Sequence, residues 1–511
     1  MRARTAFAGA IAALALLPAS AVAADPPAGA AMSSNLDYVK RLPTTAGIVE
    51  GKFDDVSGKN VLVITGRFGF KTFDVSDPTD PKLLDEFIPA DLAAGGYWQN
   101  EDMEIDRRRK LIIGALDPRH TDNPLGLCPA GGGTRPPACR SGFYVISYKD
   151  PANLKQIGDF VSLPAGHTSS CIDDCRYIWT GGPARRSDQG WLGEFVPGGR
   201  GDGRPIWVTD LRDAEHPRVS DQPIDLWRND GYTDYSHDVN IDDQGVAWVS
   251  GRGGIRGFAT SGWHRDPYQN RSRKASPFDP ILVAGGGVAG TAQPVMFMHN
   301  SERPTDGAVR ASGVKNGNVL VGTEEDFTSP CGSSGKIVAS DLTDSWGGEP
   351  GASSTVANPY RMKALDSFHP FVDTPETANP GLGCSAHYFE IKGGTLAGGW
   401  YGQGLRLVDV SNARDLRQIG YYRVTGTGAD NPSSNSWDTE WVADKRKGDL
   451  VYLFDMSRGV EILRLKNGAQ AAARMKSVVA PSVTRRDRFA ATVVSGRDSS
   501  TGRFVCPLFK R

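Results

Sequence analysis

The chain has 511 residues, which suits either two to four ordinary domains or one large repeat architecture. Its 58 Lys and Arg residues nearly balance its 59 Asp and Glu residues. This balance excludes a nucleic-acid binder that relies on bulk charge, and it excludes a disordered polyelectrolyte. The 61 Gly and 33 Pro residues make up about 18% of the chain, against a usual value of about 12%. Such a composition is typical of many short strands joined by turns and excludes long helical bundles.

The N-terminus has the pattern of a secretory signal peptide over residues 1–23. Two arginines near the start precede an apolar stretch at residues 6–18 and a small-residue cleavage site, Ala-Val-Ala, at 21–23. The apolar stretch is too short to span a bilayer, and no later stretch is long and apolar enough to do so. The first cysteine is Cys128, so no lipid-attachment cysteine follows the cleavage site. We expect a secreted, extracellular protein, with a non-cleaved anchor as the alternative, and a linker over residues 24–44.

Two later segments repeat one pattern of a strand, a Ser-Asx turn and a second strand. Residues 70–87 contain Phe-Asp-Val-Ser-Asp-Pro, and residues 405–421 contain Leu-Val-Asp-Val-Ser-Asn. Alternating apolar residues followed by Asp-Pro or Asx turns are what a β-hairpin requires. Weaker copies of the pattern lie at residues 143–151, 206–213, 336–344 and 459–465.

A second repeated piece precedes each copy. It consists of a strand with a polar head, an Asp-rich turn and a strongly apolar strand, as in residues 101–113 and 237–250. Joining the two pieces gives four strands per unit and seven units, and four-stranded units repeated radially form a β-propeller. We therefore predict an all-β fold, a seven-bladed β-propeller over residues 45–466 with four-stranded blades. Long inter-strand loops are expected at 114–140, 180–204 and 259–279.

The phrase Leu-Arg-Leu-Val-Asp-Val-Ser-Asn at 405–412, with its counterpart at Phe70, resembles the LVIVD-repeat proteins, which are secreted bacterial β-propellers. The resemblance covers nearly all of residues 45–466, although two copies alone are close to the family pattern. The copy in the fourth unit, around residues 254–258, departs from it. Most members of that family have no assigned activity, so the resemblance implies the fold and not a function.

Seven cysteines fit an oxidising compartment and predict disulfide bonds. Sequence alone does not establish their connectivity, and the absence of a Cys-x-x-Cys motif gives no support to a zinc knuckle or a thioredoxin-like site. The candidate pairs are Cys128 with Cys139, Cys171 with Cys175, and Cys331 with Cys384, which leaves Cys506 over.

A column of polar residues heads the first strands when the seven units are aligned on their first turns. In six units the head stands five or six residues before the residue that opens the turn, and in the fifth unit His299 falls at the same point. Four of the eight histidines of the chain stand in this column. The column reads Glu50, Glu101, His167, His237, His299, His387 and Asp438.

Because the first strand of each blade lines the central channel, these side chains are expected to converge near the axis. Neutral imidazole is the commonest metal ligand, and mixed sites of His and carboxylate suit copper, zinc, iron or manganese. Glu50, Glu101 and Asp438 are candidate ligands, hydrogen-bond partners of the ligands, or general bases. The alternative is a channel of polar residues bridged by ordered water.

Three further features bear on this candidate site. Glu440 follows Asp438 by two residues on the same strand face and is an alternate for it. The acidic turn Glu324-Glu-Asp326 can add oxygen ligands or a base at the rim, or can simply be solvated. The remaining histidines lie outside the column and are assigned no role; they are His120, His216, His264 and His369.

A second resemblance concerns Gly166-His-Thr-Ser-Ser-Cys171. This stretch is similar to one in the selenium-binding protein/methanethiol oxidase family, whose propellers hold copper through channel histidines. The likeness is six residues long, and Ser170 stands where that family has a further His, so it implies no substrate. It makes copper the first metal to consider.

The C-terminal segment, residues 467–511, is basic, with nine Lys and Arg residues and two Asp residues. A solvated tail is one interpretation, since runs of charge are usually solvated. Adherence to an anionic surface of the cell envelope is the other.

Two functions remain open at this stage. In the first, the histidine cluster binds copper or a similar ion and performs redox or hydrolytic chemistry on a small molecule. In the second, the propeller is a non-catalytic module that binds a ligand of the cell envelope or the extracellular space, and the histidines are structural. An open metal position beneath a cleft favours the first function, and a closed channel favours the second.

Overall fold

The structure is a computed structural model that describes most of the predicted propeller. The described residues are 24–90, 101–116, 141–164, 166–182, 184–187, 190–193, 205–226, 236–251, 254–267, 269–286, 288–289, 297–325, 335–346, 362–370, 385–444 and 448–466. The predicted signal peptide, the basic tail, His120 and five of the cysteines (Cys128, Cys139, Cys331, Cys384 and Cys506) lie outside them. No helix among the described residues is long and apolar enough to cross a membrane.

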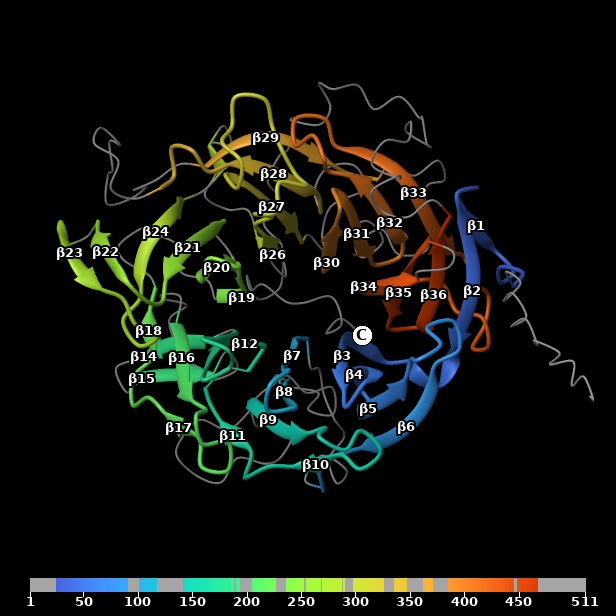
Figure 1. The fold of residues 1–511 in the computed structure, drawn as a ribbon, viewed down its shortest axis with the longest axis horizontal. Helices are drawn as coiled ribbons and strands as arrows, with labels where there is room; N and C mark the ends of the chain where they lie inside the picture. Colours follow the sequence, from blue (N-terminus) through green and yellow to red (C-terminus); the bar gives the residue numbers. More distant parts are fainter. Residues whose placement is uncertain are drawn as a thin grey trace, which may run out of the picture.

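The described strands form seven larger sheets arranged in a ring around a central axis, together with two small hairpins (Figure 1). The sheets follow one another in chain order, and in each sheet the first strand of the unit lies nearest the axis (Figure 1). The predicted all-β fold, a seven-bladed β-propeller, is confirmed.

Each of the first four blades is built from strands of its own unit only. Blade 1 contains β3 (Ile48–Val56), β4 (Lys59–Gly66), β5 (Gly69–Asp74) and β6 (Lys82–Phe87). Blade 2 contains β7 (Met103–Asp106), β8 (Leu111–Leu116), β9 (Gly142–Ser147), β10 (Lys155–Gln156) and β11 (Val161–Ser162). Blade 3 contains β12 (Thr168–Ile172), β13 (Tyr177–Gly181), β16 (Pro205–Asp210), β17 (Arg218–Val219) and β18 (Ile224–Asp225). Blade 4 contains β19 (Ser236–Ile241), β20 (Val246–Gly251), β21 (Ile255–Ala259) and β24 (Ile281–Gly286).

The last three blades each carry one strand from elsewhere in the chain. Blade 5 contains β26 (Met298–Glu302), β27 (Val319–Glu324), β28 (Ile337–Asp341) and β29 (Met362–Phe368), with β25 (Val288–Ala289) parallel to β29. Blade 6 contains β30 (Phe389–Lys392), β31 (Thr395–Trp400), β32 (Gly404–Asp409) and β33 (Arg417–Val424), with β1 (Ala30–Met32) outermost. Blade 7 contains β34 (Ser436–Asp444), β35 (Gly448–Asp455), β36 (Gly459–Leu465) and β2 (Leu36–Leu42).

Two of the predicted long loops contain hairpins of their own. Strands β14 (Ala184–Ser187) and β15 (Gly190–Gly193) pair between the second and third strands of blade 3. Strands β22 (Trp263–Asp266) and β23 (Arg271–Lys274) pair between the third and fourth strands of blade 4.

The N-terminal segment closes the ring, which differs from the linker predicted for residues 24–44. Strand β2 pairs antiparallel with β36 from Leu36 opposite Leu465 to Leu42 opposite Val460, and the 3₁₀ turn η1 (Pro43–Thr45) leads on to blade 1. Without β2, the outer edge of blade 7 would expose unpaired backbone groups. The segment therefore forms a strand because the last blade supplies the partner for its hydrogen bonds.

The apolar core lies between neighbouring blades. Val61, Val63 and Phe70 of blade 1, for example, pack with Ile112 and Tyr144 of blade 2. A cluster of the same kind joins each of the other six pairs of neighbours, including blade 7 with blade 1. Because both faces of every blade are covered, the core forms a ring and leaves the axis to the polar heads of the inner strands.

Cys171 and Cys175 form a disulfide across the turn between β12 and β13, with their sulfur atoms 1.96 Å apart. Asp173, Asp174 and Cys175 have φ values between 51° and 55°, a left-handed conformation that Asp tolerates better than most residues. The turn therefore brings two cysteines that are four residues apart close enough to bond. This pair was one of those predicted.

A buried polar network marks the point where the ring closes. The Glu461 carboxylate of β36 forms an ion pair with Arg458, with Nε–Oε2 and Nη2–Oε1 distances of 2.9 Å. The Tyr422 hydroxyl of blade 6 donates to Glu461 Oε1 at 2.9 Å, and the Tyr38 hydroxyl of β2 does so at 3.5 Å. Arg458 and Glu461 are fully buried. One carboxylate thus joins the N-terminal strand to the last two blades.

We predict that Glu461→Gln lowers the free energy of unfolding by about 3–5 kcal/mol, because it leaves the buried Arg458 guanidinium without its counter-charge. Urea denaturation followed by circular dichroism measures the change. Arg212→Ala, which removes an exposed ion pair with Asp210, is the control and should leave stability unchanged. Equal stabilities of the two variants would show that Glu461 does not hold the closure together.

Candidate metal centre

The heads of the inner strands converge on the axis because most of those strands begin with an irregular register. Pairing of β19 with β20 skips a residue between Ser236 and Asp238, so His237 is left out of the ladder. The pairing of β26 with β27 shifts in the same way between Met298 and Ser301, around His299. A bulge aims a side chain differently from the regular alternation of a strand. Here the released side chains enter the centre of the ring.

The carboxylate of Glu101 lies at the centre of four imidazoles. Its Oε2 is 2.5 Å from Nε2 of His167, and its Oε1 is 2.9 Å from Nε2 of His299. The same Oε1 lies 3.2 Å from Nε2 of His237 and 3.2 Å from Nε2 of His387. All five side chains are fully buried. Five of the seven predicted site residues therefore meet at one point.

The backbone fixes the orientation of two of these rings. Nδ1 of His237 lies 2.9 Å from the carbonyl oxygen of His299, and Nδ1 of His387 lies 2.9 Å from that of Trp437. A carbonyl oxygen can only accept, so Nδ1 carries the proton in both rings and a neutral ring has a lone pair on Nε2. In both rings that lone pair faces the Glu101 carboxylate, which is also an acceptor. A positive charge between them would turn this repulsion into attraction.

Burial sets the protonation states of the cluster. It lowers the pKa of His237 to about 4, lowers that of His387, and lowers that of His299 well below its usual value. Burial alone would raise the pKa of Glu101, but attraction to His167 and His237 holds it well below the usual range. The lowered pKa values favour the ionised form of Glu101 and the neutral forms of His237, His299 and His387. A buried carboxylate among nitrogen lone pairs is electrostatically suited to a metal cation.

Ligand atoms of the cluster also lie close enough together for shared coordination. Three groups have candidate ligand atoms within 4.8 Å of one another: Glu101 with His167 and His237, Glu101 with His299 and His387, and His237 with His299 and Glu325. Nε2 atoms of His167 and His237 are 2.9 Å apart. The four imidazoles and Glu101 therefore have the donor types and the convergence that a transition-metal ion requires.

Glu325, from the acidic turn after β27, is the sixth member of the cluster. Its Oε2 lies 4.0 Å from Nε2 of His299, and its Oε1 lies 3.9 Å from Nε2 of His387. The hydroxyl of Tyr401 donates to Oε1. Both Glu325 and Tyr401 are buried. Sequence analysis identified the acidic turn but gave no signal for Tyr401, which lies on a turn between β31 and β32.

Glu50 and Asp438 do not join the cluster. The pairing of β3 skips Val49, and that of β34 skips Trp437, so these apolar residues stand where His237 stands in blade 4. Trp437 accordingly packs against His387, with ring centroids 4.5 Å apart. Alignment on the first turns placed blades 1 and 7 one residue too far along. The two carboxylates belong to the next layer of the channel, and so does Glu440.

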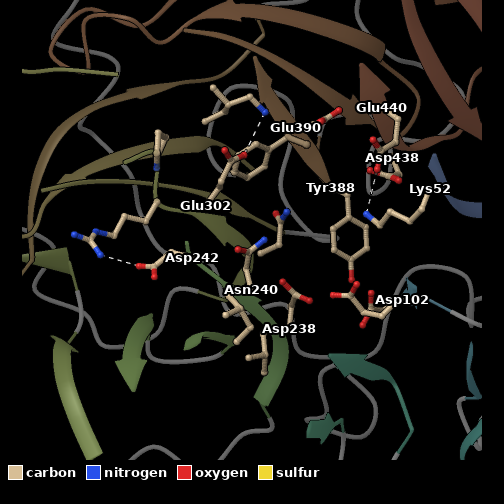
Figure 2. A pocket seen from close by; sticks show the side chains of 18 of the residues that line it. Lys52, Asp102, Asp238, Asn240, Asp242, Glu302, Tyr388, Glu390, Asp438 and Glu440 are labelled. Carbon is tan, nitrogen blue, oxygen red and sulfur yellow. Dashed lines mark hydrogen bonds and ion pairs between the residues drawn. The ribbon is translucent and has the colours of Figure 1, made fainter. Parts of the chain in front are cut away.

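That next layer is an acidic cavity of about 530 Å³ (Figure 2). Its lining includes the residues that follow the cluster in sequence, Asp102, Asp238, Asn300 and Tyr388, together with Glu50, Asp438 and Glu440. None of the four cluster histidines lines it. Burial raises the pKa of Glu50 to about 7 and that of Asp238 to about 8, and it raises that of Asp438 well above its usual value.

Tyr388 separates the cavity from the histidines. Its ring packs edge-on against His299 and His387, with centroid distances of 4.5 and 4.9 Å. Its hydroxyl lies on the side of the cavity, toward Asp102 and Asp238 (Figure 2). Among the described residues, the ring of Tyr388 therefore stands between the cluster and this cavity.

Comparisons with known proteins identify no family for the chain. No protein-family model and no curated protein matches the chain. Among solved structures, it is similar to the β-propeller domain of Cps50 (Swd1) from Myceliophteria thermophila, at 10% identity and a TM-score of 0.43, over 84% of this chain and 98% of that one. It is also similar to the computationally designed Ika8 protein, at 8% identity and a TM-score of 0.41, over 84% of this chain and 98% of that one.

We predict that Glu101→Gln stabilises the metal-free protein by about 1 kcal/mol, because an amide N–H₂ can donate to an imidazole lone pair that the carboxylate repels. Urea denaturation in the presence of a chelator measures the change. Glu215→Gln, at an exposed turn, is the control and should have no effect. A less stable Glu101→Gln variant would mean that the carboxylate is already balanced by a protonated histidine.

Proposed function

We propose that this chain is an exported β-propeller that binds one transition-metal ion through His167, His237, His299 and His387. Glu101 is either a fifth ligand or the carboxylate that holds the imidazoles in place. The observation that carries the proposal is the convergence of four buried Nε2 atoms on one buried carboxylate. Such a group is costly in a protein interior unless a charge of opposite sign balances it.

Copper is the first metal to test. Four imidazoles and a carboxylate suit copper, zinc and iron, and affinity for a given nitrogen site is highest for copper among the common divalent ions. Zinc, iron and manganese are the alternatives. The resemblance of Gly166–Cys171 to the selenium-binding protein/methanethiol oxidase family also favours copper.

In a catalytic version of this function, the bound metal supplies Lewis-acid or redox chemistry for a small molecule. The protein contributes the surroundings. The Tyr401 hydroxyl donates its proton to the Glu325 carboxylate. The oxygens of that carboxylate lie 4.0 Å from Nε2 of His299 and 3.9 Å from Nε2 of His387, so this proton is held beside the cluster. The apolar Val49, Trp437 and Met456 pack together, and the ring of Trp437 contacts that of His387.

One observation favours a second candidate, a non-catalytic binding module with a structural metal. All four histidines are fully buried, and none of them lines the cavity. Structural metal sites are closed, whereas catalytic sites keep a position open to substrate. In this version the metal secures the centre of the ring, and the acidic cavity binds an extracellular or cell-envelope ligand by itself.

We further propose that the chain is an LVIVD-type repeat protein and that residues 1–23 direct its export. The repeated Asp-Val-Ser-Asx turns support the first point, and the Cys171–Cys175 disulfide fits an oxidising compartment. The basic segment 467–511 is proposed to contact anionic surfaces of the envelope, since its charge is about +7 from nine basic and two acidic residues.

We predict close to one transition-metal ion per chain in the mature protein, measured by inductively coupled plasma mass spectrometry after purification from the export route. His237→Ala and His387→Ala should each abolish stoichiometric binding while the circular dichroism spectrum stays unchanged. His216→Ala is the matched control, because that histidine is exposed and its ring contacts Asp213 of the same turn. Unchanged metal content in both cluster variants would contradict the proposal.

We predict that chelation lowers the midpoint of thermal unfolding by several degrees and that adding back the metal restores it, since a ligand that binds only the folded state stabilises it. Differential scanning calorimetry with and without chelator measures the shift. The His237→Ala variant should show no such shift. A wild-type midpoint that does not respond to chelator or to added copper, zinc, iron or manganese would argue for a water-filled, metal-free channel.

A further inference from the structure

The cavity beside the histidine cluster is strongly acidic. Eleven of its lining residues are Asp or Glu, and three are Lys or Arg. Two of those three cations are fixed by close ion pairs: Lys52 lies 2.8 Å from Glu50 and 3.3 Å from Glu440, and Arg303 lies 2.7 Å from Asp242. The third, Arg107, points its guanidinium at the backbone of blade 1. The cavity therefore keeps a large excess of carboxyl groups over basic groups.

Asp238 and Asp438 carry part of this excess. Each side chain lines the cavity and is at most 6% exposed. Within the described residues neither forms an ion pair with Lys, Arg or His. Because buried carboxylates are stable as anions only near a balancing charge, these two create a position where a cation is favoured.

Two buried oxygen atoms that point into the cavity have no hydrogen-bond partner among the described residues. They are the hydroxyl of Tyr388, a residue that is 7% exposed, and Oδ2 of Asp438, a residue that is 4% exposed. Buried polar atoms in native proteins are nearly always paired with protein, water or ligand. The contacts of Tyr388 with His299 and His387 hold its ring in place, so its hydroxyl cannot turn elsewhere. Donors for these oxygens must come from what the cavity contains.

We propose that this cavity binds a small organic amine, whose ammonium group lies near Asp238, Asp438 and the Tyr388 hydroxyl. An ammonium group supplies both the positive charge and several N–H donors, which are the two things that the lining lacks. The aromatic ring of Tyr388 adds a surface that attracts cations. Lys52 shows that the cavity accommodates this group, since its own ammonium bridges Glu50 and Glu440 there (Figure 2).

The geometry favours an organic cation over a bare metal ion. Among the described residues, groups of three His, Cys, Asp or Glu ligand atoms within 4.8 Å of one another occur at the histidine cluster and not among the cavity carboxylates. The volume of about 530 Å³ lies within the range of sites for small organic molecules, about 300–1,000 Å³. The carboxylates are therefore spread over a space that suits an extended molecule.

The proposal that the cavity binds an amine depends on the cavity residues alone. A second step, in which the metal centre acts on this same amine, rests on the proposed function. Tyr388 is the structural link between the two, because its ring contacts two cluster histidines while its hydroxyl lines the cavity.

Isothermal titration calorimetry of the full-length mature protein tests the inference, with 1,4-diaminobutane as the probe and succinate as a four-carbon control of opposite charge. We expect one diamine per chain with a dissociation constant below about 1 mM, and no binding of succinate. Asp238→Asn and Asp438→Asn should each weaken diamine binding about tenfold or more, and Tyr388→Phe should weaken it while preserving the ring. Asp213→Asn, an exposed residue outside the cavity, should leave it unchanged.

Two further titrations separate this inference from the proposed metal function. Diamine binding by chelator-treated protein that takes up no metal would support the amine site and contradict the metal centre. Metal uptake without diamine binding would support the metal centre and contradict the amine site. Calcium binding that depends on Asp238 and Asp438, with no diamine binding, would overturn the inference in favour of a divalent-cation site. Because the wild-type titrations with diamine and succinate need no variant, the test does not depend on the folding of any substitution.

Discussion

Closing seven sheets into a ring forces the first residues of seven inner strands to share one small volume at the axis. The apolar residues are used between the blades, where both faces of every sheet are covered. What remains at the axis is set by the heads of the inner strands, and five of these are Glu101 and four histidines. Every other feature of the centre follows from placing one carboxylate and four imidazoles together in a fully buried space.

That placement creates two layers of different chemistry along the channel. In one layer, nitrogen lone pairs and a single carboxylate converge within ligand distance of one another, which suits a metal ion. One residue further along, the inner strands of blades 1, 2, 4 and 7 place carboxyl groups around a larger cavity, where the Lys52 ammonium pairs with Glu50. Alternation along an inner strand thus separates the histidine layer, where we propose a metal, from the carboxylate layer, where we propose an amine, and the ring of Tyr388 lies between them.

The fold was predictable because each blade repeats the same pattern of alternating residues and Asx turns, and five of the seven polar heads were predictable from their distance to a turn. Glu50 and Asp438 were misplaced because the skipped residues of blades 1 and 7, Val49 and Trp437, stand one residue further before the turn than the counting assumed, and counting along a sequence does not detect this. Strand β2 was missed because its partner, β36, lies more than 400 residues away in the chain. Tyr401 was missed for a similar reason, because it is distant from Glu325 in the sequence and the two meet only in the folded ring of blades.

The central claim concerns where a metal ion binds, and anomalous X-ray diffraction at the absorption edge of the metal in purified protein tests it most directly. The account predicts one anomalous peak per chain, surrounded by the Nε2 atoms of His167, His237, His299 and His387. A metal-loaded crystal whose anomalous peak lies among the cavity carboxylates or on the surface, with the histidine cluster unchanged, would contradict it.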